Sequence, residues 1–324
     1  MLLLGVAMVV RYWHDRRQIS AAPAADLADL QRRAEADPSG EQAQLALGIG
    51  LERAGKLGEA RQALLAADRA APADPKPPLW LGMVAIEAKN FPQAERELVE
   101  ALRRDPGNTD ASRALGQLYL RDGRDAQAVP LLERAAAAQP NDAAAWRLLG
   151  SAEFRLRQLS RGRESLQRAV KLDPGDATAL ASLAESDLLL GLLEEARASY
   201  AAALKLRPDD ADALTGMAEV SVQLDPSPNG LAAASEPLDR AMRANPTPRA
   251  YLVRGHIHLL RQEYPAAEAD LKQALAGSPT LAEADGYLSQ VYAQTGRPEE
   301  ARRAVASYER AAAARKAPAA TAPR

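Results

Sequence analysis

Few residues of this chain have the type and spacing that chemistry would need. His256 and His258 are the best candidates for metal ligands, because they stand close together in the sequence His-Ile-His. Residues two apart on a helix point about 200° from each other, whereas helical residues that share one metal ion stand three or four apart. We therefore expect one histidine to be partly buried and the other to lie on the face of a ligand groove, with no metal site.

Other signatures of catalysis are missing from the sequence. There is no cysteine, which excludes thiolate catalysis, disulfides and cysteine-ligated zinc. No phosphate-binding glycine loop, nucleophile elbow or His-Glu-x-x-His helix occurs. The adjacent acids Glu194 and Glu195 are expected at the start of a helix, where carboxylates favour the positive end of the helix dipole. These observations predict a protein that is not an enzyme and uses no cofactor.

The composition indicates helices rather than one thick core. Alanine, leucine, arginine and glutamate dominate, and aromatic residues make up only 4% of the chain. A length of 324 residues exceeds the usual single core, so two domains, a barrel-sized domain or a repeat array are expected. Lys and Arg total 41 against 43 Asp and Glu. This balance leaves no basic footprint for nucleic acid, which is therefore not expected as a partner.

An evenly spaced series of prolines shows that the chain is built from repeats. Six prolines follow one another at intervals of 34 residues: Pro38, Pro72, Pro106, Pro140, Pro174 and Pro208. Proline ends helices because it lacks an amide hydrogen and disfavours helical geometry in the residue before it. Even spacing of helix ends therefore predicts an internal repeat of 34 residues.

Small residues recur in the same phase. The pair Leu-Gly ends at Gly48, Gly82, Gly116 and Gly150, and further columns of alanine run through the other half of each repeat. Small side chains let neighbouring helices approach closely, while leucines fill the space between them. Each repeat is therefore predicted to hold a first helix, a short turn, a second helix and a stop.

The period and its residues resemble the tetratricopeptide repeat, whose pattern is Trp, Leu-Gly, Tyr, Ala, aromatic or Leu, Ala, Pro. One repeat supplies Trp146, Leu149, Gly150, Leu166, Ala169 and Pro174. Another supplies Leu115, Gly116, Tyr119, Ala128, Leu132, Ala135 and Pro140. The resemblance implies an all-α fold, a right-handed superhelical solenoid of helix-turn-helix repeats.

The phase of the pattern predicts the domain organisation. Eight repeats are expected at residues 41–74, 75–108, 109–142, 143–176, 177–210, 211–247, 248–281 and 282–315. The sixth is longer, and its extra residues are expected in the turn at residues 224–230. A capping helix is expected within residues 22–40, and a disordered tail at residues 316–324.

The resemblance also implies where a ligand would lie. In this family the first helices line a concave groove. Counting along each first helix by that resemblance places eight residues on the inward stripe: Arg113, Gln117, Arg121, Arg147, Ser151, Arg155, Glu185 and Glu219. The four arginines would form two short columns that favour an acidic segment, and the two glutamates would make the groove dipolar. The alternative is that these are ordinary solvated faces.

The predicted function is that of a non-catalytic scaffold that holds a peptide or protein segment in the groove, for a membrane-associated assembly. Two alternatives stay open: a soluble solenoid that associates with itself, and a regulatory subunit of a separately encoded enzyme. The sequence does not fix the oligomeric state.

The first residues are expected to be the end of a membrane anchor. Met1 to Val10 are apolar and precede Arg11, Arg16 and Arg17. Ten residues reach roughly 15 Å along a helix, about half of a bilayer core of roughly 30 Å. Residues 1–21 are therefore predicted to be a truncated anchor, similar to that of bacterial inner-membrane tetratricopeptide proteins. The basic flank predicts repeats that face the cytoplasm. A periplasm-facing chain and a soluble cytoplasmic one are the alternatives.

Overall fold

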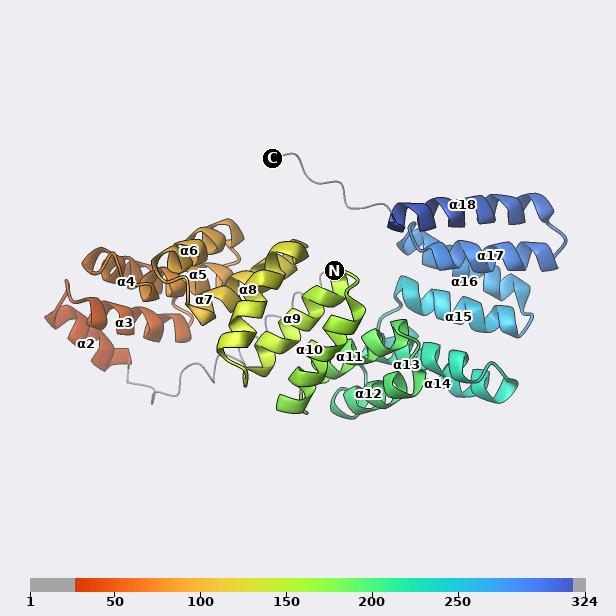
Figure 1. The fold of residues 1–324 in the computed structure, drawn as a ribbon, viewed down its shortest axis with the longest axis horizontal. Helices are drawn as coiled ribbons and strands as arrows, with labels where there is room; N and C mark the ends of the chain where they lie inside the picture. The colour runs from red at the N-terminus through yellow and green to blue at the C-terminus, as the bar shows by residue number, and fades with distance from the viewer. Residues whose placement is uncertain (1–26, 317–324) are drawn as a thin grey trace. The chain divides into compact units, whose positions relative to one another are not determined.

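A computed structural model describes residues 27–316, which form 17 helices and no strand. The short helix α2 (Leu27–Ala36) comes first, and the others follow as eight antiparallel pairs (Figure 1). The first helices are α3 (Glu41–Arg53), α5 (Lys76–Glu87), α7 (Thr109–Arg121), α9 (Ala143–Arg155), α11 (Ala177–Leu189), α13 (Ala211–Leu224), α15 (Pro248–Leu260) and α17 (Ala282–Gln294). The second helices are α4 (Leu57–Ala70), α6 (Phe91–Arg104), α8 (Asp125–Ala138), α10 (Leu159–Leu172), α12 (Leu193–Leu206), α14 (Pro228–Ala244), α16 (Tyr264–Gly277) and α18 (Pro298–Lys316). The predicted all-α repeat fold is confirmed, while the eight repeat boundaries stay a prediction.

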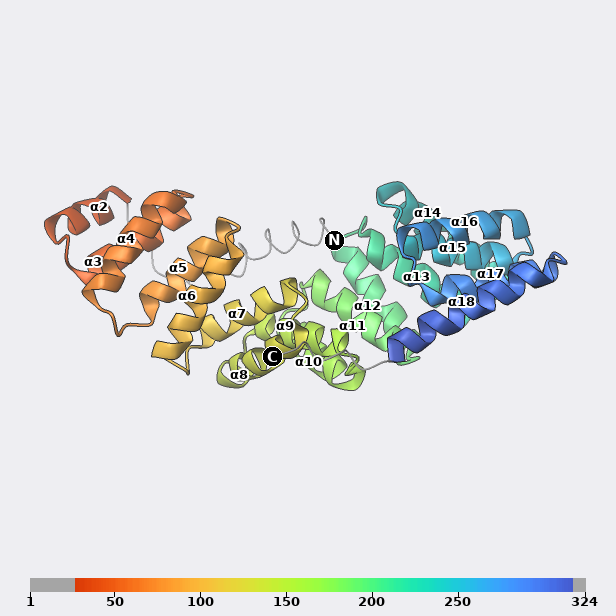
Figure 2. The same ribbon diagram turned by 90° about the horizontal axis from the view of Figure 1, so that it is seen from above.

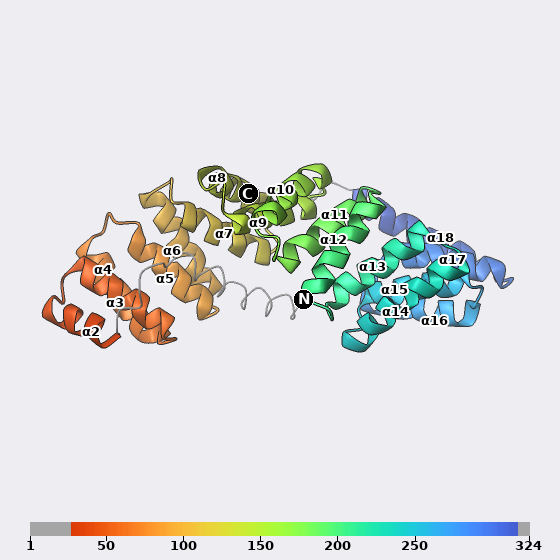
Figure 3. The ribbon, with the colours of Figure 1, turned by 90° about the horizontal axis from the view of Figure 1, so that it is seen from below.

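The chain divides into two compact units between Asp173 and Pro174. Of the described helices, α2 to α10 belong to the first unit and α11 to α18 to the second. In the first unit each pair packs on the one that follows it (Figure 2). In the second unit α13 packs on both α14 and α15, and α15 packs on α16 and α17 (Figure 3).

Side-chain caps and turns explain why the helices begin and end where they do. Asp142 accepts hydrogen bonds from the backbone amides of Ala144 and Ala145, at 2.9 and 3.2 Å, so it satisfies amides that the helix α9 leaves unpaired. In seven of the eight described pairs, the turn between the two helices places one residue in the left-handed region, for example Gly123 at φ 72°. Glycine tolerates this conformation without steric cost. The non-glycine residues in this conformation are Lys89, Arg157 and Gln262.

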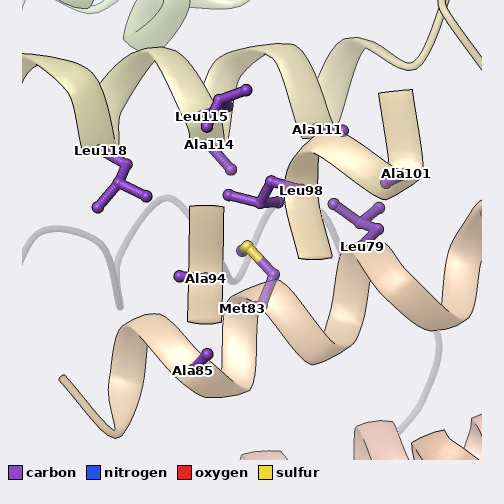
Figure 4. Packing of buried hydrophobic residues seen from close by; sticks show 10 residues of the cluster. All are labelled: Leu79, Met83, Ala85, Ala94, Leu98, Ala101, Ala111, Ala114, Leu115 and Leu118. Atoms are coloured by element: carbon purple, nitrogen blue, oxygen red, sulfur yellow. The ribbon is translucent and has the colours of Figure 1, made fainter. Parts of the chain in front are cut away.

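The core of each pair is built from small residues facing leucines. A methyl group placed on Gly116 would stand 2.7 Å from Cγ of Leu132, so a larger residue would require the Leu132 side chain between α7 and α8 to shift. The core that joins α5, α6 and α7 is of the same kind, with Leu98 fully buried between Met83 and Leu115 (Figure 4). Close approach of this kind is the packing that the recurrent Leu-Gly pairs predict.

One pair departs from this arrangement. Tyr200 on α12 takes the place that Leu132 has on α8 and Leu166 has on α10, and it is 1% exposed. A methyl group on Gly216 of the following helix α13 would overlap its ring. The ring of Tyr200 therefore extends from α12 to α13, where Gly216 leaves the space that it occupies.

The extra residues of the sixth repeat lengthen its helices and not its turn, contrary to the sequence prediction. The helix α13 extends to Leu224 and α14 begins at Pro228, which leaves a turn as short as the others. Ser227 caps α14 by accepting a hydrogen bond from the amide of Gly230, and proline suits the first turn of a helix. The proline-rich stretch thus starts a helix of 17 residues.

The predicted location in a bacterial inner membrane is wrong for the part of the chain that the structure describes. Within residues 27–316 no helix has the length and apolar character that crossing a bilayer requires. The segment on which the anchor was predicted, residues 1–21, lies outside the described residues. So does the predicted tail, apart from Lys316, which is the last residue of α18.

Candidate functional site

The candidate site is the surface that the first helices present outside their packing with the second helices, here called the first-helix face of each unit. The six predicted residues from Arg113 to Arg155 lie on α7 and α9 of the first unit. Glu185 and Glu219 lie on α11 and α13 of the second unit. The predicted dipolar set is therefore divided between two units, and each unit is described by itself.

Arg113 joins two first helices of the first unit. Its side chain is 12% exposed and stands 3.4 Å from carboxylate oxygens of both Asp110 and Asp142. Asp142 is the residue that caps α9, so its second oxygen faces Arg113 while the first binds the helix amides. Arg113 thus fixes the start of α9 against α7, and little of its guanidinium is left for a partner.

Three further predicted residues also offer little open surface. Arg147 is 7% exposed and counts among the buried charged residues. The hydroxyl of Ser151 donates a hydrogen bond of 2.9 Å to the backbone oxygen of Arg147, four residues before it. Gln117 is half-buried on α7. These residues contribute more to the packing of α7 and α9 than to an accessible charged column.

Arg121 and Arg155 are the exposed members of the predicted set. The guanidinium of Arg121 lies 2.5 Å from Asp122 and 3.0 Å from the centroid of the Phe91 ring. Arg155 donates to the backbone oxygen of Leu120 at 2.5 Å and stands 3.3 Å from Asp125. Each arginine therefore has an acid of its own chain beside it, and the positive field that the sequence predicted is partly offset.

In the second unit, a guanidinium stands between the two predicted glutamates. Arg249 of α15 donates at 2.7 Å to Glu185, and at 3.0 and 2.7 Å to one oxygen of Glu219. The network joins α11, α13 and α15, which come from three successive pairs. Burial disfavours the charge of Arg249, yet the two carboxylates raise its pKa above the ordinary value.

Tyr200 completes this network from the side of the second helices. Its hydroxyl donates a hydrogen bond of 2.6 Å to Glu185, on the same carboxylate oxygen that Arg249 binds. Burial, followed by the negative charge of Glu185, raises the pKa of Tyr200. The hydroxyl thus stays protonated and can act as a donor at neutral pH.

The two histidines contact different groups, as their spacing predicts. His256 stacks on Tyr287 with ring centroids 4.2 Å apart, and burial lowers its pKa. His258 lies 2.5 Å from Glu263 and 3.6 Å from Asp270. Among residues 27–316 no group of three or more ligand-type side chains could hold a metal ion.

Sequence reasoning missed Arg249, which binds both predicted glutamates on the first-helix face of the second unit. Its signal was present, because Arg249 is the second residue of its repeat and so belongs to the stripe from which Glu185 and Glu219 were chosen. A second omission is an inter-repeat clamp. Arg124 binds Glu95 of the preceding second helix at 2.7 and 2.8 Å and lies 4.0 Å from the Tyr119 ring centroid.

Stacked antiparallel helix pairs, with small residues where the helices cross, define an α-helical repeat protein. Two family models, both described as tetratricopeptide repeat, match the sequence, one over residues 85–152 and the other over residues 147–211 and 229–282. Together they span more than half of the chain, which therefore belongs to the tetratricopeptide-repeat family. No curated protein matches the sequence.

Solved structures agree with this fold. A tetratricopeptide-repeat protein from Parabacteroides merdae is 18% identical, with a TM-score of 0.54 over 78% of this chain and 98% of its own. PilF of Pseudomonas aeruginosa is 17% identical, with a TM-score of 0.54 over 67% of this chain and 97% of its own. YrrB, described as having an unusual peptide-binding site, is 20% identical, with a TM-score of 0.51 over 59% of this chain and 97% of its own. At these identities the likeness concerns the fold.

Proposed function

We propose that this protein is a non-catalytic scaffold that holds a segment of another protein on its first-helix faces. Tetratricopeptide-repeat domains bind proteins or peptides. The observation that carries the proposal for this chain is the exposure of Arg121 and Arg155, which occupy the same position on the successive first helices α7 and α9. YrrB, which shares the fold, is described as having a peptide-binding site, and this supports the proposal.

The partner segment carries an acidic residue that binds Arg121 and Arg155. Both arginines are exposed, and the pairs that they form with Asp122 and Asp125 lie at the surface. Exposed ion pairs contribute about 0.2 to 1 kcal/mol, so a partner carboxylate that accepts two bonds from one guanidinium can replace them. Arg113 and Arg147 would support the positions of α7 and α9 rather than bind the partner.

The test is a pull-down with the full chain from cells of its natural source, with the captured proteins identified by mass spectrometry. Binding of the captured partner is then measured for the wild type and for R121E/R155E. The matched control is R61E/R96E, which makes the same charge change at exposed arginines of α4 and α6. We expect the first variant to weaken binding about tenfold or more and the control to change it little.

Three results would count against this function. If R121E/R155E and R61E/R96E weaken binding equally, the arginines act only through net charge. If no protein is captured and the chain sediments as a concentration-dependent oligomer, the self-associating alternative is favoured instead. A captured enzyme whose rate changes on binding would favour the regulatory-subunit alternative.

A further inference from the structure

The first helices of the second unit are acidic as a set. They carry six carboxylates, Glu185, Asp187, Asp212, Glu219, Glu283 and Asp285, against two guanidiniums, Arg249 and Arg254. The second helices of this unit do not share the excess as a set, since α12, α14, α16 and α18 together carry nine acids and ten basic residues. Negative charge is thus segregated to one layer of the unit.

Part of this charge lies on the first-helix face. Asp212 and Glu219 are seven residues apart on α13 and therefore share one side of the helix. Arg249 binds Glu219 and Glu185, but one guanidinium cannot neutralise these two carboxylates and Asp212 together. The pKa of Asp212 is raised, first by desolvation and next by the negative charge of Asp210, while the charge of Arg249 lowers it. Asp212 and Glu283 are both exposed.

Two exposed leucines lie at the carboxyl ends of the first helices α11 and α15. Leu189 follows Glu185 by four residues on α11 and is 42% exposed. Leu260 follows His256 by four residues on α15 and is 39% exposed. His256 in turn stacks on Tyr287 of α17. Large apolar side chains left exposed on an acidic face are consistent with a surface that a partner covers.

We infer that the first-helix face of the second unit binds a basic amphipathic segment of a partner protein, with lysine or arginine facing Asp212 and Glu283 and apolar side chains covering Leu189 and Leu260. The argument is charge complementarity joined to exposed apolar surface. The inference rests on the proposed function, because it takes the first-helix faces as the binding surface. It assigns the second unit a ligand chemistry opposite to that of the first.

The experiment uses the full chain and two fluorescein-labelled synthetic peptides. One is composed of lysine, leucine and alanine, and the other has glutamate in place of every lysine. Fluorescence anisotropy measures the Kd of each peptide for the wild type, for D212N/E283Q and for L189S/L260S. The matched controls are E194Q/E195Q and L206S/V305S, whose residues are exposed on second helices of the same unit. Circular dichroism checks that each variant keeps its helices.

The wild type is expected to bind the basic peptide about tenfold more tightly than the acidic one at low salt. D212N/E283Q and L189S/L260S should each weaken that binding about three- to tenfold, with both controls within about twofold. Equal binding of the two peptides, or an equal loss in the controls, would overturn the inference. If either of these two results occurs while binding of the captured partner still depends on Arg121 and Arg155, this inference fails and the proposed function stands. Loss of both dependences removes the proposed function as well.

Discussion

Arg249 changes the interactions that Glu185 and Glu219 make. By the family pattern, Glu185 and Glu219 form an acidic column; in the structure they form an ion-pair network with Arg249. The pattern places residues on a face, but it does not tell which of them bind each other across helices. That pairing depends on the distances between α11, α13 and α15, which tertiary packing sets.

Removing Arg249 should destabilise the second unit. In R249A the carboxylates of Glu185 and Glu219 lose their shared counter-charge, and we expect a loss of about 1 to 3 kcal/mol in the free energy of unfolding. Urea denaturation followed by circular dichroism measures it. R197A is the control, since its pair with Glu194 is exposed and should contribute little. If R249A and R197A cost the same, the network does not stabilise the fold.

Tyr200 and Gly216 should be energetically coupled. A methyl group on Gly216 overlaps the Tyr200 ring, so we expect G216A to destabilise the protein by about 2 kcal/mol or more. In a Y200L background the same substitution meets a shorter side chain and should cost less. A double-mutant cycle from urea denaturation gives the coupling energy. A coupling energy near zero would show that the Tyr200 ring does not pack against Gly216.

The stability of the protein should respond to acid through Glu268. Hydrogen bonds from Arg297 and then Lys272 lower the pKa of Glu268 from its ordinary value of 4.5 to about 2. A depressed pKa in the folded state contributes stability above pH 4.5, and this stability is lost as the pH falls towards 2. We expect E268Q to be less stable than the wild type at pH 6 and to show a shallower decline below pH 4.5, measured by thermal denaturation. E309Q, at an exposed site, should keep the wild-type slope.

Among the elements, the positions of the helices were the most predictable feature. The proline series marks where second helices end, and Asp142 and Asp176 cap the helices that follow. These signals act within a few residues, so the sequence alone reveals them. The exception is α14, which also begins at a local signal. Ser227 caps this helix and Pro228 is its first residue, whereas the sequence prediction placed a turn there.

The clamp between successive pairs occurs in both units. In the first unit it consists of Glu95, Arg124 and Tyr119. In the second unit the equivalent residues are Glu268, Arg297 and Tyr292, with Arg297 at 2.6 Å from Glu268 and 4.4 Å from the ring centroid of Tyr292. A guanidinium that binds a carboxylate with two nitrogens and lies on an aromatic ring combines two interactions that lysine cannot reproduce.

Replacing the clamp arginine should therefore weaken the contact between two pairs. We expect R124K and R297K each to lower the free energy of unfolding by about 0.5 to 1.5 kcal/mol, although the charge is kept. Urea denaturation of the full chain measures both. The comparison is R103K, whose exposed pair with Glu100 lies within one helix and should matter less. A loss in R103K as large as in R124K would mean that the clamp has no special role.

At the scale of the whole molecule, the division at Asp173 predicts that each unit can fold alone. Repeat proteins are stabilised by contacts between neighbouring repeats, so a set of four pairs carries most of what it needs. We expect fragments 27–173 and 174–316, produced separately, to be helical by circular dichroism and to unfold cooperatively in urea. A fragment with little helix, or with no cooperative transition, would show that the division does not mark a folding boundary.

The packing of Tyr200 against Gly216 affects how this array of repeats can change by gene duplication. In pairs such as α7 and α8, the glycine and the leucine that fit each other belong to one repeat, so that repeat can be copied or deleted as a self-contained piece. Tyr200 fits only beside the glycine of the next repeat, because its ring extends into α13. Recombination between residues 200 and 216 would place the ring against whatever residue the new neighbour carries there. The α11–α12 and α13–α14 pairs are therefore expected to be inherited together, as one block of four helices.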